Sequence, residues 1–245
     1  MEHGTHSERK SEPRLNKYHR EGDVDYGGSN MITAKKDKFV AIFKQLLADP
    51  RLYMLFQKAV GGVRARKLCI RQYLAIPKGA RILDIGCGPG FVAAFVPHST
   101  YVGYDVERRY IEYAQRRYSS LGTFNHGEYN RQELEKYEPF DFVMMNGLLH
   151  HLDDSIALHL LKLAMDSLKP GGKVLCIDGG LHPKQNAFAR YLIKEDRGEF
   201  LRSPEAYEQL AVKVFGKAYV KTDLREDLFY IPYSLVIMIL EKPEE

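Results

Sequence analysis

Short apolar runs alternate with amphipathic stretches between residues 81 and 180. The runs RILDIG, YVGYD, FDFVMMN and KVLCIDG have the length of strands, and TFNHGEY follows the second of them. The stretches ERRYIEYAQRRY and DDSIALHLLKLAMDSL repeat apolar residues at helical spacing, RQELEKY predicts a short helix, and another helix is predicted to begin near Phe91. Strands that alternate with amphipathic helices indicate crossover units, so we expect an α/β fold with a parallel sheet covered on both faces.

Three amphipathic segments precede this region. The first lies at residues 39–47, the second opens at Pro50, and the third ends at Leu74. Before them, residues 1–34 carry mixed charge and few aliphatic side chains, which predicts a disordered tail. We therefore expect a tail at residues 1–34, helices that cap the active site at residues 35–75, and a core domain at residues 76–245.

The alternation changes after Gly180. NAFARYLIKED and SPEAYEQLAVKVF predict helices, and KAYVKTDL and YSLVIMILEK predict two closing strands. These strands are linked too closely for another full crossover, so we expect them to pair antiparallel. Asp153 and Ser203 are predicted to cap the helices that follow them.

Composition narrows the class of protein. The chain has 245 residues, of which 44% are hydrophobic, and its 36 Lys and Arg nearly balance 32 Asp and Glu. This balance argues against a nucleic-acid partner, and basic stretches such as RARK are expected to be solvated helix faces. The three cysteines are widely spaced, which predicts no metal site and favours a reducing compartment. With no apolar signal region and no run long enough to span a membrane, we expect a cytoplasmic protein.

A glycine-rich turn follows the first predicted strand. The sequence ILDIGCGPGF places Gly86, Gly88 and Gly90 directly after an apolar run. In open parallel sheets ligands bind beyond the carboxyl ends of the strands, and glycines there let a ligand approach the backbone because no Cβ intervenes. A tight strand-to-helix turn without a ligand would use the same glycines. Asp105 adds a second signal, since an acid at the end of the next strand can accept hydrogen bonds from a ribose diol, although an N-cap uses the same residue type.

The order of residues in this turn distinguishes two adenosine cofactors. A dinucleotide site favours the spacing G-x-G-x-x-G, whereas here Phe91 occupies the place of the last glycine. Asp84 precedes the first glycine, and an acid beside the turn repels a pyrophosphate but suits an ammonium group. S-adenosylmethionine carries an ammonium, a sulfonium and no phosphate. The turn therefore favours this cofactor and argues against an NAD-dependent dehydrogenase.

Together with YVGYDV, FDFVMMNGLLHHLDD and LKPGGKVLCIDG, the turn resembles the successive motifs of class I S-adenosylmethionine-dependent methyltransferases. The tail from EDRGEFLR onward resembles a bacterial subgroup of small methyltransferases. The resemblance implies a Rossmann-like three-layer sandwich, in which a mostly parallel sheet of seven strands has an antiparallel last strand. It also implies the cofactor contacts, which are Asp84, Gly86, Cys87, Gly88, Gly90 and Phe91 around the methionine portion, Asp105 on the ribose, Val106, Glu128 and Tyr129 around the adenine, and Asn146 and Gly147 beneath the sulfonium. Glu128 departs from the Asp that the family usually has at its position.

Methyl transfer to oxygen or nitrogen can need a base. The candidates are His150 and His151, which follow the fourth predicted strand, and Asp178, which ends the fifth. Histidine titrates near neutrality, and proton removal in the transition state contributes roughly 10²–10⁴-fold. A hydrogen-bonded structural role is the alternative for each, and the resembling family commonly has a histidine at the position of His151.

Added segments are expected to select the acceptor. We expect a substrate cap at residues 181–202, in which Tyr191, Arg197 and Arg202 are candidate substrate-binding residues, with helix packing and solvated charge as the alternatives. The predicted reaction moves a methyl group from S-adenosylmethionine to an oxygen, nitrogen or carbon of a small molecule. The competing hypotheses are an RNA acceptor, which a basic surface stripe would favour, a protein acceptor, and a non-catalytic cofactor-binding module, which the intact turn and Asp105 oppose.

Overall fold

The computed structural model describes residues 49–195 and 199–244. The expected tail at residues 1–34, the first predicted helix at residues 39–47 and the candidate Arg197 therefore lie outside the described residues. The described residues belong to one compact unit of the chain.

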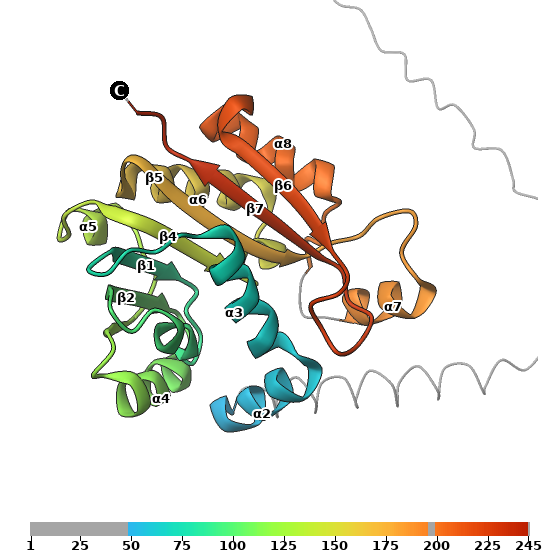
Figure 1. Cartoon of the computed structure of the whole chain (residues 1–245), viewed down its shortest axis with the longest axis horizontal. Coiled ribbons are helices and arrows are strands. Elements are labelled where there is room, and N and C mark those ends of the chain that lie inside the picture. Colours follow the sequence, from blue (N-terminus) through green and yellow to red (C-terminus); the bar gives the residue numbers. More distant parts are fainter. Residues whose placement is uncertain (1–48, 196–198, 245) are drawn as a thin grey trace, which may run out of the picture. The chain divides into compact units, whose positions relative to one another are not determined.

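A single sheet runs through the described ranges, with seven strands in the order β3-β2-β1-β4-β5-β7-β6. Its strands are β1 (Arg81–Ile85), β2 (Thr100–Asp105), β3 (Thr123–His126), β4 (Phe140–Asn146), β5 (Leu168–Gly179), β6 (Val220–Arg225) and β7 (Leu235–Glu241). The pairs among β1 to β5 are parallel, and β7 is antiparallel to both β5 and β6, as the opposed arrows of β6 and β7 show (Figure 1). The predicted α/β class, the mostly parallel sheet and the antiparallel last strand are confirmed.

The helices cover both faces of this sheet. They are α2 (Pro50–Val60), α3 (Gly62–Tyr73), α4 (Arg108–Tyr118), α5 (Arg131–Leu134), α6 (Asp154–Ser167), α7 (Ala187–Glu195) and α8 (Pro204–Phe215), with 3₁₀ turns η1 (Phe91–Phe95), η2 (Leu149–His151) and η3 (Lys217–Tyr219). Local chemistry sets several ends. Both predicted N-caps are confirmed, since Asp153 accepts a hydrogen bond from Ile156 N and Ser203 accepts one from Ala206 N.

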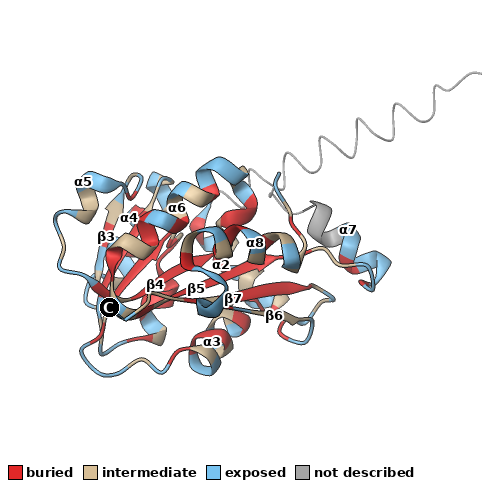
Figure 2. Cartoon of the chain, turned by 90° about the horizontal axis from the view of Figure 1, so that it is seen from above, coloured by how far each residue is buried: buried red, intermediate tan, exposed pale blue. Residues whose placement is uncertain are grey.

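Side chains of the central strands alternate between two buried clusters. Leu83 and Ile85 of β1 pack with side chains from α6 and α8, whereas Ile82 packs with side chains from α2, α3 and α4. Successive strand residues point to opposite faces, so Asp84 follows Ile82 onto the face that carries α3. Buried residues follow the strands and the inner sides of the helices, while the outer helix sides are exposed (Figure 2). The result is the three-layer arrangement expected from the sequence.

One element, the segment that follows the glycine turn, differs from the sequence prediction. The sequence predicts a helix that begins near Phe91, but the chain forms only the short 3₁₀ turn η1 there. Pro97 cannot continue a helix because it lacks an N–H and its ring collides with the preceding turn. Since β2 already begins at Thr100, there is no room for an α-helix before it.

Neither a membrane span nor a metal cluster is found in the part of the chain that the structure describes. No helix there has the length and apolar character that crossing a bilayer requires. No group of three His, Cys, Asp or Glu side chains in the same ranges could hold a metal ion. Cys69, Cys87 and Cys176 are buried free thiols.

Candidate functional site

The glycine turn between β1 and η1 forms one wall of the site. Gly86, Gly88 and Gly90 have φ values of 74°, 54° and 76°, in the region that favours glycine. A Cβ on Gly90 would lie 2.6 Å from Cε1 of Phe124, so Gly90 closes the turn against the core. A Cβ on Gly88 would meet nothing nearer than the Tyr110 ring at 4.0 Å. The space beside Gly88 is therefore open to a ligand.

Asp105 at the end of β2 fixes the conformation of this turn. Its Oδ2 accepts a hydrogen bond from Gly88 N at 2.8 Å, and its Oδ1 accepts one from Glu107 N at 2.8 Å. Burial raises the pKa of the carboxyl, and the two N–H donors oppose that rise. The N-cap of α4 is Glu107 rather than Asp105. Because a carboxylate oxygen accepts more than one hydrogen bond, Asp105 can bind a ligand hydroxyl as well as hold the turn.

Asp84, near the end of β1, is a fully buried acid. Its Oδ2 accepts a hydrogen bond from the Tyr101 hydroxyl at 2.5 Å, while Oδ1 is buried without a partner among the described residues. Burial raises the pKa of this carboxyl to about 7, although the Tyr101 hydrogen bond and the charge of Arg66 oppose the rise. A buried acceptor of this kind is stabilised by a ligand that brings a donor or a positive charge.

Asn146 and Gly147 end β4, the strand next to β1. Both polar atoms of the Asn146 side chain are buried without a hydrogen-bond partner in the described ranges. Gly147 has φ 72°, and a Cβ there would lie 3.5 Å from Arg66 Nη2 and 3.6 Å from His150 Cε1. The absent side chain therefore leaves a space that a guanidinium and an imidazole flank.

Arg66 was missed by the sequence analysis, which assigned the basic stretch RARK to a solvated helix face. Its Nη1 donates to Gln57 Oε1 at 2.9 Å and to the Gly62 carbonyl at 3.3 Å, and its guanidinium lies 5.7 Å from the centre of the Phe91 ring. Nη2 faces Gly147. The helical spacing of Arg66 from the buried residue Ile70 was the signal that could have placed it on the inner side of α3.

His150 and Asp178 form a buried pair across the ends of β4 and β5. His150 lies in η2 and is 6% exposed, and Asp178 is 1% exposed. His150 Nδ1 is 2.7 Å from Asp178 Oδ1, and the His150 backbone N–H donates to the same oxygen at 3.2 Å. Oδ2 of Asp178 is buried without a partner in the residues described. The neighbouring His151 is exposed, with its ring centre 4.1 Å from that of His150.

Comparison with known proteins shows the family to which the chain belongs. The sequence model of the methyltransferase domain matches residues 62–213. The chain belongs to this methyltransferase domain family. The predicted family, the class I S-adenosylmethionine-dependent methyltransferases, is thereby confirmed.

Relatives of this methyltransferase domain include enzymes of two kinds. Phosphoethanolamine N-methyltransferase 1 of Arabidopsis thaliana is 28% identical over 194 residues, which are 76% of this chain and 38% of that protein. Ubiquinone biosynthesis O-methyltransferase of Dinoroseobacter shibae is 34% identical over 116 residues, or 46% of each chain. The chain therefore spans less than half the length of these two relatives.

A solved structure shares the fold. Phosphoethanolamine N-methyltransferase 2 of Haemonchus contortus, in complex with S-adenosyl-L-methionine, superposes with a TM-score of 0.55 at 18% identity. The superposition covers 73% of this chain and 52% of that one. The likeness concerns the fold of the methyltransferase domain.

The other predicted cofactor residues differ in how the methyltransferase domain presents them. Val106 is 64% exposed beside Asp105, and Glu128 is also exposed, so both are accessible to a ligand. Cys87 and Phe91 are buried beneath the turn, with Cys87 Sγ packed so closely that a Cβ on Gly103 would lie 2.8 Å from it. These two residues support the turn from below.

The side chain of Tyr129, which was predicted to lie beside the adenine, packs into the core. Its hydroxyl is 3.0 Å from Ser167 Oγ, and its ring packs against the Tyr104 ring with centres 5.2 Å apart. The side chain is 5% exposed and belongs to the buried cluster under α6 and α8. The contact of Tyr129 with the adenine stays a prediction, and the direction of its ring is one that the strand-end position alone does not specify.

Arg202, a predicted substrate-binding residue, is hydrogen-bonded within the protein. It is 9% exposed, and Nε, Nη1 and Nη2 all donate to protein oxygens. It therefore offers no donor to an acceptor molecule. Tyr191 on α7 is 47% exposed and stays a candidate for the substrate side.

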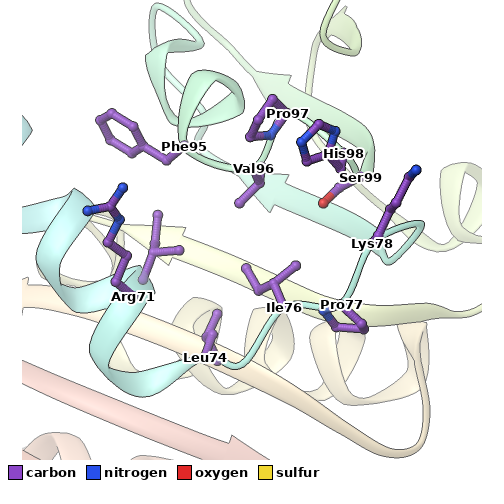
Figure 3. A pocket seen from close by; sticks show the side chains of 11 residues that line it. Arg71, Leu74, Ile76, Pro77, Lys78, Phe95, Val96, Pro97, His98 and Ser99 are labelled. Atoms are coloured by element: carbon purple, nitrogen blue, oxygen red, sulfur yellow. The ribbon is translucent and has the colours of Figure 1, made fainter.

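A separate hollow lies at the opposite edge of the methyltransferase sheet. Its lining includes Ile70, Arg71 and Leu74 from the end of α3 and Phe95 and His98 from the segment that leads into β2 (Figure 3). No residue predicted for cofactor or acceptor binding lines it. The unpartnered buried polar atoms of Asp84, Asn146 and Asp178, in contrast, lie toward the carboxyl ends of β1, β4 and β5 in the described residues, where ligands bind in open parallel sheets.

Proposed function

We propose that this chain binds S-adenosylmethionine and transfers its methyl group to an oxygen, nitrogen or carbon nucleophile of a small molecule. The observation that carries the proposal is the set of buried polar atoms beside the open glycine turn, namely Asp84 Oδ1 and the amide of Asn146, which have no well-formed hydrogen bond among the described residues. A buried polar group without a partner costs about 1–3 kcal/mol. A ligand that supplies the partners recovers this free energy on binding.

The residues present fit S-adenosylmethionine from one end to the other. Asp84 would accept from the ammonium, and Arg66, with Nη2 directed at Gly147, would donate to the carboxylate. Asp105 would bind the ribose hydroxyls, and the exposed Val106 would pack against the adenine. The bare backbone at Gly88 would allow the close approach. The predicted contact of Glu128 with the adenine stays a prediction.

The protein's own part in the reaction is positioning and proton removal. When bound, S-adenosylmethionine supplies a methyl group that the sulfonium already activates. The chain would align the acceptor with this methyl group and exclude water, since holding reactants in line supplies much of the rate in such transfers. His150 would take a proton from an oxygen or nitrogen acceptor. Asp178 Oδ1, 2.7 Å from Nδ1, would accept from an Nδ1–H of the imidazole, and Nε2 would then be the nitrogen that receives the proton.

A small acceptor is favoured by the relatives and by the segment after β5. The name of one relative specifies phosphoethanolamine and that of the other specifies ubiquinone biosynthesis, and both phosphoethanolamine and ubiquinone are small molecules. We infer that residues 181–202 form the cap over the acceptor, with the exposed rings of Phe188 and Tyr191 on its α7. The role predicted for Arg197 and the cytoplasmic location stay predictions.

Thermal unfolding with added ligands tests the proposal. S-adenosylmethionine and S-adenosylhomocysteine are each expected to raise the melting temperature, because a ligand at 100 times its dissociation constant adds about 2.7 kcal/mol of stability. NAD is the matched adenosine ligand and is expected to leave the melting temperature unchanged. Stabilisation by NAD alone would contradict the proposal. Incubation of a small-metabolite extract with a labelled methyl donor would then identify the acceptor.

A further inference from the structure

The side chain of Arg202 is a buried clamp with five hydrogen bonds. Nη1 donates to the carbonyls of Leu149 at 2.8 Å and Phe200 at 3.0 Å. Nη2 donates to the Leu152 carbonyl at 2.6 Å and to Asp154 Oδ1 at 2.7 Å, and Nε donates to the same Asp154 oxygen at 3.0 Å. A guanidinium has five N–H donors, so each of them is used.

Two of these acceptors flank the turn that carries His150. Leu149 immediately precedes His150 within η2, and Leu152 follows the turn. The backbone of His150 is also held on both sides, because its N–H donates to Asp178 and its carbonyl accepts from Phe200 N at 2.9 Å. The segment from Phe200 to Arg202 therefore contacts the His150 turn through both side chain and main chain.

We propose that Arg202 is a positioning residue, which holds the η2 turn so that the His150 imidazole stays on Asp178. The inference rests on the proposed role of His150 as the base. Arg202 touches neither the cofactor space nor the imidazole, so it acts through the turn.

The shape of the guanidinium explains why an arginine is needed. Its planar fork reaches three backbone carbonyls and one carboxylate at fixed angles. A lysine ammonium carries its donors on a single nitrogen and cannot span Leu149 O and Leu152 O in the same way. Asp154, whose side chain is 70% exposed, supplies the counter-charge at the start of α6. Loss of the fork would free the turn even where the fold survives.

Arg202 also joins the two ends of the proposed cap, residues 181–202. Leu181 N donates to the Arg202 carbonyl at 3.1 Å, and Gly180 and Arg202 form a parallel bridge. The two ends of residues 181–202 are therefore joined at the residue that holds the His150 turn.

Nuclear magnetic resonance of histidine side chains tests this inference without cofactor or acceptor. In protein labelled with ¹⁵N-histidine, the His150 ring signals are identified by their loss in His150→Gln among the nine histidines of the chain. We expect Arg202→Met to displace the His150 Nδ1–H signal or broaden it beyond detection. Arg225→Met is the matched control, because Arg225 also clamps distant elements, with bonds to Asp227 and Gln72, but lies away from η2. That control is expected to leave the His150 signals in place.

The outcomes separate positioning from general stabilisation. A folded Arg202→Met protein with His150 signals identical to those of the wild type would overturn the inference, whatever its melting temperature. If Arg202→Met does not fold, Arg202→Lys is measured in its place and judged by the same signals. Failure of S-adenosylmethionine to bind would overturn the proposed function and leave this result standing, since the spectra are recorded without ligand.

Discussion

His150 Nδ1 lies 2.7 Å from Asp178 Oδ1, and both side chains are almost fully buried. The two residues come from different strand ends, and nothing in their spacing along the chain links them. An imidazole held on a carboxylate keeps one tautomer and is stabilised when it accepts a proton. The pair is therefore the strongest candidate for a base at the carboxyl edge of the sheet.

Replacement of His150 tests that role. We expect His150→Ala to lower turnover at least about tenfold, since proton removal by a positioned side chain is worth roughly 10²–10⁴-fold. Affinity for S-adenosylhomocysteine should stay near that of the wild type. Turnover is measured as labelled methyl transferred per enzyme, and His159→Ala, on an exposed position of α6, serves as the control. Unchanged turnover would remove His150 from the mechanism.

The pKa of Asp84 predicts how the ligand-free protein responds to pH. The folded-state pKa is raised to about 7 by burial, whereas the unfolded group titrates near pH 4. Between these values the folded state binds more protons than the unfolded state, so the free energy of unfolding falls as pH rises and levels off above about pH 7. Asp84→Asn removes this contribution. In urea unfolding at a series of pH values, wild type should lose stability relative to the variant by up to about 1.4 kcal/mol per pH unit.

Asp141 offers a control of opposite sign on the same sheet. Burial alone would raise the pKa of its carboxyl, but the Arg81 N–H and the Lys169 ammonium hold the pKa below its usual value. Its stabilisation is present above the unfolded pKa and is lost as pH falls. In the Asp141→Asn variant, the free energy of unfolding should therefore still fall with rising pH up to about pH 7, because Asp84 is unchanged. Parallel stability curves for wild type and Asp84→Asn would show that folding does not raise the pKa of Asp84.

Arg66 is expected to distinguish ligands that have an amino-acid tail from those that lack it. Arg66→Ala should weaken S-adenosylmethionine and S-adenosylhomocysteine by roughly 10–100-fold, the range for a lost hydrogen bond to a charged group. Binding of 5′-methylthioadenosine, which has no carboxylate, should change little. Isothermal titration compares the three ligands, with Arg71→Ala on the exposed side of the same helix as the control. An equal loss for all three would assign Arg66 a structural role instead.

Alanine substitutions at Gly88 and Gly90 of the turn are expected to have different effects on stability and on cofactor binding. Alanine at Gly79, Gly88 or Gly90 introduces a side chain at positive φ, which costs roughly 1–2 kcal/mol at each. Gly79→Ala is the reference because no atom lies within 4 Å of its added Cβ. Gly90→Ala should lose more stability, since its Cβ would lie 2.7 Å from Ala114 Cβ. Gly88→Ala should lose no more stability than the reference but should weaken cofactor binding.

Two measurements on each variant check this contrast. Urea unfolding gives the stability, and titration with S-adenosylhomocysteine gives the affinity. If Gly88→Ala binds as tightly as Gly79→Ala, the open space beside Gly88 is not part of the cofactor site.

The sequence by itself determined the succession of strands and helices along the chain and the strand ends at which the glycine turn and Asp105 lie. Strand ends, caps and the glycine turn depend on residues that are near each other in the chain, so Asp84, Gly88 and Asp105 could be located at one edge before the fold was seen. Asp153 and Ser203 could be named as caps for the same reason. The α-helix predicted to begin near Phe91 does not form, because Pro97 and the start of β2 leave too few residues for it. The residue pattern around Phe91 does not by itself show this limit.

Only the tertiary structure decided which of these side chains meet and which way they face. His150 and Asp178 are 28 residues apart, and Arg202 reaches Leu149 across 53. Such contacts depend on how separate elements pack, and the spacing of residues along the chain does not predict that packing. Arg66 turned inward, Tyr129 turned into the core and Arg202 became fully bonded for this one reason: the direction of a side chain is chosen by its neighbours in space.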